Sequence, residues 1–310
     1  MPVFQDMKFT SGTGLNTIYA KKCIPDSQPR AIIQIAHGIV EKIDRYDDFM
    51  MYLSQQGFLV VGNDHLGHGK SVQKSEERGF FALKNGWNYV VEDMVRLHDR
   101  ISAEYPGIPY IMFGHSMGSF LTRTYMIDHP DKYDYAILSG TGHQGAALVN
   151  AGLAAASLLC KIKGVKSDGK MLNDVAFGSY LDKIENPRTA YDWLSRDVAK
   201  VDEYIADPDC GYICTASVYR DMMSGIKYIT NAANIKRMAK EKPVYFMSGA
   251  EDPVGEYGKG VERAYKAFCK AGLHDVTIRL YPEGRHEMLN ETNRADVYAD
   301  ILKWINEKLA

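Results

Sequence analysis

The chain has 310 residues, of which 45% are hydrophobic and 25% are charged, and its formal net charge is −2. This composition is ordinary for a globular protein that can bury a sizeable core, and the balanced charge argues against nucleic-acid binding or a basic membrane-binding surface. The five cysteines are odd in number and scattered, and the N-terminus lacks the basic and apolar regions of a signal peptide, so we expect reduced thiols in a cytoplasmic protein.

The first 140 residues alternate between short apolar runs and helical patterns. The first two runs are joined by a turn-rich segment and predict a hairpin, and AIIQIA predicts a more buried third strand. In chain order, the expected strands are residues 7–10, 16–20, 31–36, 58–62, 110–113 and 135–139, and the expected helices are residues 46–56 and 87–105 and one that follows Ser116. Strands that alternate with helices predict a mostly parallel sheet with right-handed crossovers.

The alternation stops after Gly140. Residues 141–240 have mainly helical patterns and no convincing buried strand, and a block of this length is too long for a loop. Alternation then resumes with strands at residues 244–248 and 276–281, and with helices at residues 261–271 and 294–309. We therefore predict an α/β fold with a discontinuous core, residues 1–140 and 241–310, and an inserted helical cap, residues 141–240.

The sequence GHSMG at residues 114–118 lies between a predicted buried strand and a predicted helix. This order is the context that a nucleophile elbow requires, with Ser116 at the tip of a tight turn. Gly114 and Gly118 would leave room where side chains would collide with the neighbouring strand and helix. Ser116 would also lie at a helix N-terminus, where free N–H groups favour developing negative charge. We predict that Ser116 is a catalytic nucleophile. The apolar face expected for the following helix consists of Phe120, Leu121, Tyr125 and Met126.

A serine hydroxyl needs a base, and the base needs an orienting carboxylate. Where a nucleophile elbow is present, the chain order is serine, then an acid after a late strand, then a histidine after the last strand. Asp252 and His286 are the natural choices in these two loops. We expect Ser116, Asp252 and His286 to form the catalytic triad.

Three other residues compete for these roles. Glu251 is adjacent to Asp252 and would point elsewhere if Asp252 faces the site. His274 precedes the last strand, and His143 lies at the entry to the cap. These positions fit the triad order less well.

The tetrahedral intermediate of acyl transfer needs two N–H donors for its oxyanion. The first should be the backbone N–H of Met117, directly after the nucleophile. The second should come from the loop after the third strand, where we assign it to the N–H of Ile39.

Two pairs of residues could suggest a metal site. His65 and His68 are three apart on a glycine-rich loop without a helical face, and no third ligand is evident. Cys210 and Cys214 lack a second pair at zinc spacing. We expect no metal and interpret these residues as structural.

Several segments together resemble the monoacylglycerol lipase and lysophospholipase group of α/β-hydrolases, which includes serine aminopeptidase-like hydrolases. The matching segments are His37-Gly38 with Glu41 and Arg45-Tyr46, DHLGHGKS at 64–71, GHSMG at 114–118, GAEDPV at 249–254 and RHEMLNE at 285–291. The resemblance implies an esterase for acyl glycerol or lysophospholipid-like substrates, without a cofactor. It assigns catalysis to Ser116, Asp252 and His286 and the oxyanion contacts to Ile39 and Met117.

The sequence departs from that group in its expected substrate pocket. Group members often have a small residue after His-Gly, whereas this chain has Ile39-Val40, and we expect Ile39 to narrow the acyl side of the substrate pocket. The cap matches the group poorly. We expect substrate contacts from Ile39, His115 and cap residues within 141–240.

The least polar region begins the cap. Residues 146–160 are rich in alanine and leucine, and we expect them to be too short to span a bilayer. One interpretation is a mobile lid helix that admits an acyl chain and touches a micelle or membrane surface. The interpretation that we favour is a helix packed on the core.

The main functional hypothesis is a serine carboxylic-ester hydrolase for monoacylglycerols, lysophospholipids or similar esters. An aminopeptidase of the proline iminopeptidase type is the nearest alternative, and it would use an acidic cluster in the cap. The candidate acidic residues are Asp202, Glu203, Asp207 and Asp209. A small-ester esterase or an acyltransferase would use the same triad, and a non-catalytic binding protein would usually lack one of its members. We expect a small-molecule or lipid ester as substrate, at most transient contact with a membrane or micelle, and no nucleic acid.

Overall fold

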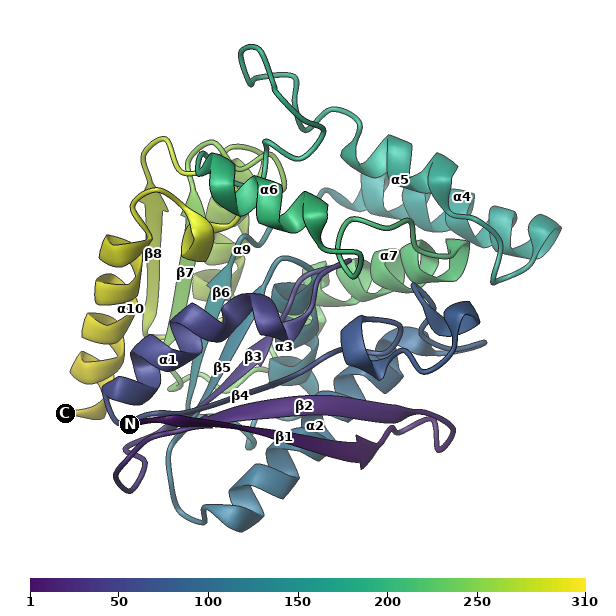
Figure 1. The fold of residues 1–310 in the computed structure, drawn as a ribbon. Coiled ribbons are helices and arrows are strands. Elements are labelled where there is room, and N and C mark those ends of the chain that lie inside the picture. Colours follow the sequence, from purple (N-terminus) through teal and green to yellow (C-terminus); the bar gives the residue numbers. More distant parts are fainter.

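The computed structural model describes all 310 residues, and an eight-stranded sheet runs through its centre (Figure 1). The strand order is β1-β2-β4-β3-β5-β6-β7-β8. The pairs β1/β2 and β2/β4 are antiparallel, and all other pairs are parallel. The strands are β1 (Val3–Thr10), β2 (Thr17–Ile24), β3 (Ile32–Ala36), β4 (Leu59–Asn63), β5 (Tyr110–His115), β6 (Tyr135–Ser139), β7 (Val244–Gly249) and β8 (Val276–Tyr281). The predicted α/β fold is confirmed.

Helices cover both faces of the sheet, so its central strands are buried on both sides. In β5, Tyr110 and Met112 belong to one hydrophobic cluster, and Ile111 and Phe113 belong to the other. This two-residue alternation is the geometry of an extended strand. Helices α1 (Asp47–Gln55) and α10 (Arg294–Leu309) cover one face, whereas α2 (Gly86–Glu104), α3 (Met117–Asp128) and α9 (Lys259–Lys270) cover the other.

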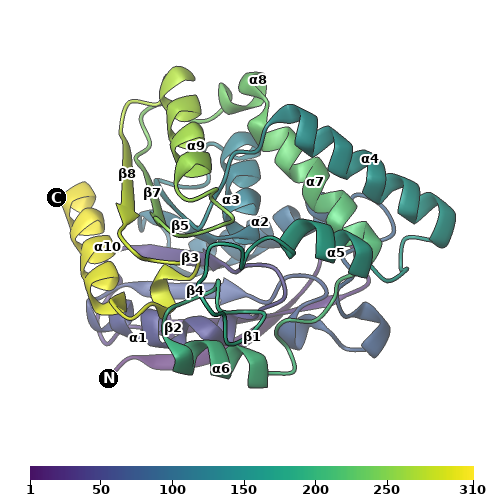
Figure 2. The same ribbon diagram turned by 90° about the horizontal axis from the view of Figure 1, so that it is seen from above.

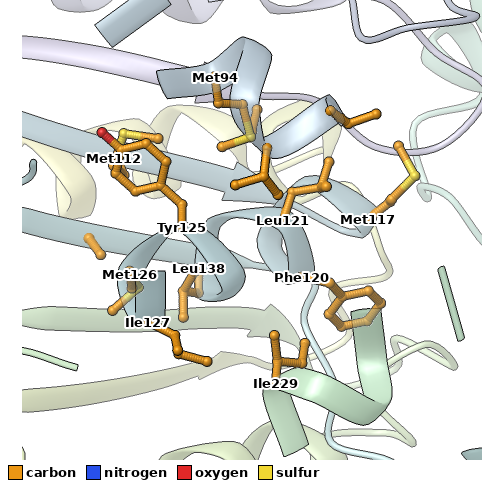
Figure 3. Close-up of a cluster of buried hydrophobic side chains, with 14 of the residues drawn as sticks. Met94, Met112, Met117, Phe120, Leu121, Tyr125, Met126, Ile127, Leu138 and Ile229 are labelled. Carbon is orange, nitrogen blue, oxygen red and sulfur yellow. The ribbon is translucent and has the colours of Figure 1, made fainter. Parts of the chain in front are cut away.

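Helix α3 carries the residues that follow Ser116, and it is buried all round rather than along one face. Residues 117–127 are all buried. Figure 3 shows why: α3 packs among the sheet, Met94 of α2 and Ile229 of α7. The expected apolar face is therefore part of a more extensive contact, because α7, which belongs to the segment after β6, also covers α3.

All residues between β6 and β7 form one insertion, residues 140–243, with helices and no strand. Its helices are α4 (Ala146–Lys163), α5 (Lys170–Phe177), α6 (Val198–Ala206), α7 (Ala216–Thr230) and α8 (Ala232–Ile235). Figure 2 shows α4 alongside α7, with α5 near them and α6 nearer to α1. The division of the chain into a core and a cap with its own boundaries stays a prediction.

Helix α4 differs from the expectation for the least polar region. It is 18 residues long with a mean hydropathy of 1.4, which is long and apolar enough to cross a membrane by length and composition alone. The prediction that this region is too short to span a bilayer is therefore wrong, because the helix continues beyond residue 160 through Lys161 and Lys163. Only 17% of its residues are buried. Val149, Ala156 and Cys160 are the buried ones, and α4 packs against α7.

Arg123 of α3 holds the start of the insertion and the last turn of α7. Its Nη1 donates to the carbonyl of Gly142 at 2.7 Å, and its Nη2 donates to the carbonyl of Ile229 at 3.2 Å. The guanidinium is fully buried. The start of the insertion and the end of α7 therefore lie side by side against α3, the helix that follows Ser116.

The N-terminal hairpin is longer than its apolar runs predict. β1 and β2 pair over eight residues from Val3↔Ile24 to Thr10↔Thr17. The expected second strand stops before Lys21 and Lys22, yet both side chains are buried and form ion pairs. A lysine in a sequence usually predicts an exposed position. Its long apolar stem can nevertheless pack on a sheet while its ammonium group pairs with a carboxylate.

Candidate active site

Ser116 lies at a sharp turn between β5 and α3. Its backbone has φ 54° and ψ −122°, an unfavourable combination for a residue with a side chain. The turn is held by the hydrogen bond from Ser116 N to Ser139 O at 2.9 Å. A hydroxyl in this position projects from the carboxyl end of the sheet, as the elbow motif predicts.

The two glycines of the elbow allow close approach of the chain. A Cβ on Gly118 would lie 1.9 Å from the carbonyl oxygen of Ala36 in β3. A Cβ on Gly114 would lie 2.5 Å from both the Gly118 carbonyl and the Thr122 hydroxyl. Side chains at these positions would force α3 away from the sheet.

Asp252 and His286 come together although they follow different strands. Nδ1 of His286 is 3.0 Å from both carboxylate oxygens of Asp252. Asp252 also accepts hydrogen bonds from the Ser248 hydroxyl at 3.1 Å and the Val254 N–H at 2.9 Å. The pair is buried. This arrangement holds a proton on Nδ1 and leaves Nε2 of His286 free to act as a base.

Burial and neighbouring charges affect the two histidines of the site in opposite directions. Burial alone would lower the pKa of His286, but the Asp252 carboxylate raises it above its ordinary value of 6.5. Burial, with a smaller contribution from His286, lowers the pKa of His115 to about 3. His115 therefore stays neutral beside His286, and their ring centroids are 4.7 Å apart.

A cavity of about 280 Å³ opens over Ser116 and His286. Ile39 and His115, both expected to contact substrate, line it. The insertion contributes most of the apolar wall, through residues that include Phe177, Leu181, Trp193, Tyr204 and Ile213. The hydrogen bonds of His286 in this structure go to Asp252 and to the Trp193 carbonyl rather than to Ser116.

The two predicted oxyanion donors are both available. The N–H groups of Ile39 and Met117 donate no hydrogen bond within the protein. Ile39 lines the cavity, and Met117 N begins α3 directly after Ser116. The assignment of the triad and of these donors stays a prediction, now with a compatible geometry.

Glu41 and Glu287, which line the cavity, belong to a buried charge cluster. Arg45 binds both oxygens of Glu287 at 2.6 Å and Oε2 of Glu41 at 2.7 Å. Oε1 of Glu41 accepts hydrogen bonds from Gly38 N and the Tyr46 hydroxyl. Burial raises the pKa of Glu287, but the Arg45 guanidinium lowers it to about 2. The cluster therefore ties the loop that carries Ile39 to the loop that carries His286.

The competing triad residues lie away from the cavity. Glu251 is exposed, and His274 pairs with Glu241 at 3.0 Å. His143 Nδ1 is 3.4 Å from Nη2 of Arg123. None of these competitors lines the cavity.

The acidic residues proposed for an aminopeptidase are dispersed and paired. Asp207 and Asp209 bind Lys42, and Asp209 also binds Arg78. Asp202 pairs with Arg188, and Glu203 pairs with Lys200. None of the four lines the cavity.

The two histidines of the glycine-rich loop surround a third one, His37. The N–H of His65 donates to Nε2 of His37 at 3.0 Å, and the His37 and His65 ring centroids are 4.1 Å apart. His68 is 5.4 Å from His37 by the same measure. These contacts support the loop that leads to Ile39, in keeping with a structural role.

Sequence reasoning missed two features of the site. The contact of Arg45 with Glu287 joins residues 242 apart, and no local pattern predicts that pairing, although both residues lie in the segments that carry the resemblance. Trp193 lies within residues 141–240, from which the sequence predicts substrate contacts, but no motif predicts that its ring centroid lies 5.1 Å from that of His286.

Comparison with known proteins gives consistent matches over nearly the whole chain. Residues 27–293 match the family described as serine aminopeptidase, S33. The chain is 25% identical to monoglyceride lipase from Mus musculus, over 99% of this chain and 92% of the mouse protein. It is 27% identical to monoacylglycerol lipase from Mycolicibacterium smegmatis, over 91% of this chain and 90% of that protein. It is also similar to a thermostable carboxyl esterase from Bacillus coagulans solved in complex with glycerol, with 30% identity, 99% coverage of both chains and a TM-score of 0.93.

Proposed function

Because the chain belongs to the serine aminopeptidase S33 family of hydrolases, we propose that this lipase-type ester hydrolase cleaves monoacylglycerols, lysophospholipids or similar single-chain esters. The observation that carries the proposal is the cavity over Ser116 and His286, which is lined by apolar side chains together with a few polar and charged ones. The apolar lining suits an acyl chain, and the polar lining suits a hydroxylated or charged head group.

In the proposed first half-reaction, Oγ of Ser116 attacks the ester carbonyl carbon while Nε2 of His286 takes the hydroxyl proton. The negative charge moves to the carbonyl oxygen, which accepts hydrogen bonds from the N–H groups of Ile39 and Met117. The C–O bond to the alcohol then breaks, and His286 returns its proton to the departing alcohol. Asp252 holds the imidazole in the tautomer that this exchange requires.

In the proposed second half-reaction, water replaces the alcohol. His286 removes a proton from the water as its oxygen attacks the acyl carbon bound to Ser116. Collapse of the second intermediate releases the carboxylic acid and restores the serine hydroxyl. No cofactor is required, because the ester and water supply every atom of the products.

The size of the cavity and the relatives support a substrate with one acyl chain. About 280 Å³ lies near the lower end of the range for small-molecule sites, roughly 300 to 1,000 Å³. The mouse and mycobacterial relatives are named for glycerol monoesters, and the Bacillus coagulans relative was solved with glycerol. Ile39 would limit the acyl side of the cavity.

The dispersed acidic residues disfavour the aminopeptidase alternative. A free α-amino group would need an unpaired carboxylate next to the scissile bond. Asp202, Glu203, Asp207 and Asp209 are each paired with a lysine or arginine outside the cavity. Esters therefore fit the site better than peptides.

We further propose that the lipid substrate is taken from a micelle or membrane surface through transient contact with α4 and α5. Leu148 and Ile162 of α4 are 67% and 71% exposed, and Val175 of α5 is 81% exposed. The opposite side of α5 contributes Asn173 and Phe177 to the cavity wall. An exposed apolar helix face can bury itself at the boundary of a lipid surface.

The test is an acyl-length series of p-nitrophenyl esters from acetate to palmitate, with 1-monooleoylglycerol, lysophosphatidylcholine and peptide nitroanilides alongside. We expect the highest kcat/KM for longer acyl chains and glycerol monoesters, and none for peptides. Ser116→Ala is the matched control for each substrate.

Other outcomes would contradict the proposal in distinct ways. Activity only on acetate and butyrate would leave a small-ester esterase. Cleavage of the nitroanilides would establish the aminopeptidase alternative. Transfer to an added alcohol in preference to water would identify an acyltransferase. Failure to react with a serine-directed phosphonate would indicate a non-catalytic binding protein.

A further inference from the structure

One segment of the insertion runs directly along the loop that carries His286. We call residues 192–196 the latch segment and residues 283–291 the histidine loop. The N–H of His286 donates to the carbonyl of Trp193 at 3.3 Å, and the N–H of Glu287 donates to the carbonyl of Leu194 at 2.7 Å. The backbone of the catalytic base is thus hydrogen-bonded to the insertion.

A buried carboxylate in the histidine loop strengthens this contact. Glu291 is 0% exposed, and it accepts hydrogen bonds from the N–H and the Nε of Arg196, both at 3.0 Å. It also accepts the N–H of Arg285, the residue before His286, at 3.0 Å. A single carboxylate therefore fixes the latch segment and the start of the catalytic turn together.

Two further side chains bridge the same elements. Nη1 of Arg285 donates to the carbonyls of Asp192 at 2.6 Å and Ser195 at 3.2 Å. The Ser195 hydroxyl donates to the carbonyl of Asn290 at 2.9 Å. The two elements are thus joined along most of the latch segment.

The imidazole of His286 lies against two aromatic rings. The ring centroid of Trp193 is 5.1 Å from that of His286 at an interplanar angle of 41°, and His115 is at 4.7 Å and 47°. Trp193 also stacks on Phe177 at 6.2 Å and meets Tyr180 edge-on at 4.9 Å, both in the insertion. The ring that contacts the base is therefore itself held by the insertion.

We propose that the latch segment positions His286. The ion pair of Arg196 with Glu291 anchors the segment to the histidine loop, and the Trp193 ring fixes the orientation of the imidazole. The inference rests on the proposed role of His286 as the base. Asp252 contacts only Nδ1, which leaves the ring free to tilt about that contact. The latch segment fixes the backbone on one side and the ring face on the other.

A misplacement of about 1 Å in a catalytic group can lower a rate about 100-fold. Loss of the latch contacts should therefore lower kcat more than it raises KM. This expectation separates positioning from substrate binding, because a residue that only binds substrate changes KM.

Charged and titratable groups face His286 from each packed element. The groups around the ring are Asp252, His115, Glu287 and Glu41, with Arg45 paired to both glutamates. Trp193 contributes burial and no charge. Its removal should expose one ring face to water, favour the imidazolium and shift the acidic limb of the rate profile to higher pH.

The experiment compares Trp193→Ala, Trp193→Phe, Arg196→Met and Arg196→Lys in the full chain, with p-nitrophenyl butyrate as substrate. We expect Arg196→Met to lower kcat about 10- to 100-fold with KM within about twofold, and Arg196→Lys to restore part of the loss. We expect Trp193→Ala to move the midpoint of the acidic limb to higher pH by about half a pH unit or more, and Trp193→Phe to move it less.

Arg188→Met is the matched control, because it removes the same kind of side chain from an exposed ion pair of the insertion, with Asp202 at 2.7 Å. It should leave kcat and the limb unchanged. Thermal unfolding monitors the fold of each variant. If Arg196→Met does not fold, the Trp193 variants still test the proposal, because they keep the Arg196–Glu291 ion pair.

Phosphonate labelling separates failure of this inference from failure of the proposed function. A wild-type chain that neither reacts with the phosphonate nor hydrolyses esters would overturn both. A reactive wild type whose folded Arg196→Met and Trp193→Ala variants keep the wild-type kcat and acidic limb would overturn the latch alone. Reduced kcat with a shifted limb in the Trp193 variant supports it.

Discussion

Two parts of the same insertion meet their surroundings in different ways. Helices α4 and α5 expose leucine, isoleucine and valine, and α4 is largely unburied outside its contact with α7. The latch segment is hydrogen-bonded to the histidine loop and contributes Trp193 to the face of His286. The insertion is therefore not uniform: we propose that its outer part meets substrate or lipid and that its inner part positions His286. Local opening is easiest where buried contacts are few, so α4 and α5 should move more readily than the latch segment.

Removal of the proposed nucleophile should lower kcat more than any other substitution considered below. Ser116→Ala should fold normally and lose roughly 10⁶-fold in kcat, as in other serine triads. Steady-state assays with p-nitrophenyl butyrate and thermal unfolding measure both quantities. Activity near that of the wild type would refute the proposed mechanism. It would also refute the proposed role of the latch segment in positioning His286.

Ion pairs on the two sides of the insertion should differ in their contribution to stability. Arg45 is buried between Glu41 and Glu287 and lies 4.8 Å from the ring centroid of Tyr204 in α6. Arg45→Met leaves two buried carboxylates uncompensated and should lower the free energy of unfolding by about 3–5 kcal/mol. Urea unfolding is the measurement.

The control for this prediction lies on the outer side. Lys170 pairs with Asp174 on α5, and both side chains are exposed. Lys170→Met should change the free energy of unfolding by less than about 0.5 kcal/mol. Equal effects of the two substitutions would remove the contrast between the inner and outer sides.

The pH dependence should report on the inner side alone. His286 must be neutral to accept a proton, and Asp252 raises its pKa above 6.5 despite burial. kcat/KM should therefore fall as the pH decreases through a value above 6.5. His115, with a pKa of about 3, should not contribute a limb between pH 5 and pH 8.

Asp252→Asn provides the matched variant for the pH prediction. Loss of the carboxylate should move the acidic limb to lower pH and reduce kcat about 10⁴-fold, by analogy with other triads. The rate is to be followed from pH 5 to pH 9 in constant ionic strength. If the acidic limb of the rate profile kept its wild-type midpoint in this variant, a group other than His286 would cause the titration.

The smallest effect should come from the outer face of α4. Leu148→Ser with Ile162→Ser should change thermal stability little, because both side chains are exposed. Hydrolysis of 1-monooleoylglycerol in vesicles should fall several-fold, whereas hydrolysis of soluble p-nitrophenyl butyrate should not change. An equal loss on both substrates would place these residues in folding or catalysis rather than in lipid contact.

The sequence predicts the fold best where local patterns are strong. β6, β8 and α10 have the expected bounds because apolar periodicity and turn residues mark both ends. The second strand is underestimated because the buried Lys21 and Lys22 interrupt its apolar pattern. The strand order, in which β4 lies between β2 and β3, depends on pairings that no local pattern encodes.

The candidate site likewise contains residues that local patterns predict and contacts that they do not. Ser116, Asp252 and His286 could be proposed because each follows a recognisable strand in a fixed chain order. The contacts of Trp193 and Arg196 with the histidine loop could not be proposed, because they join residues about 90 positions apart. Such contacts depend on how the insertion folds back over the sheet, and the insertion carries no motif of its own.

Arg123 gives this architecture a practical consequence for protein engineering. By holding the carbonyls of Gly142 and Ile229, it keeps the start of the insertion and the last turn of α7 side by side on α3. We therefore expect foreign segments grafted between these two points to leave the core in place. A graft that replaces residues 146–177 should alter which esters are accepted and keep turnover, whereas a graft that extends through residue 196 should sacrifice turnover as well.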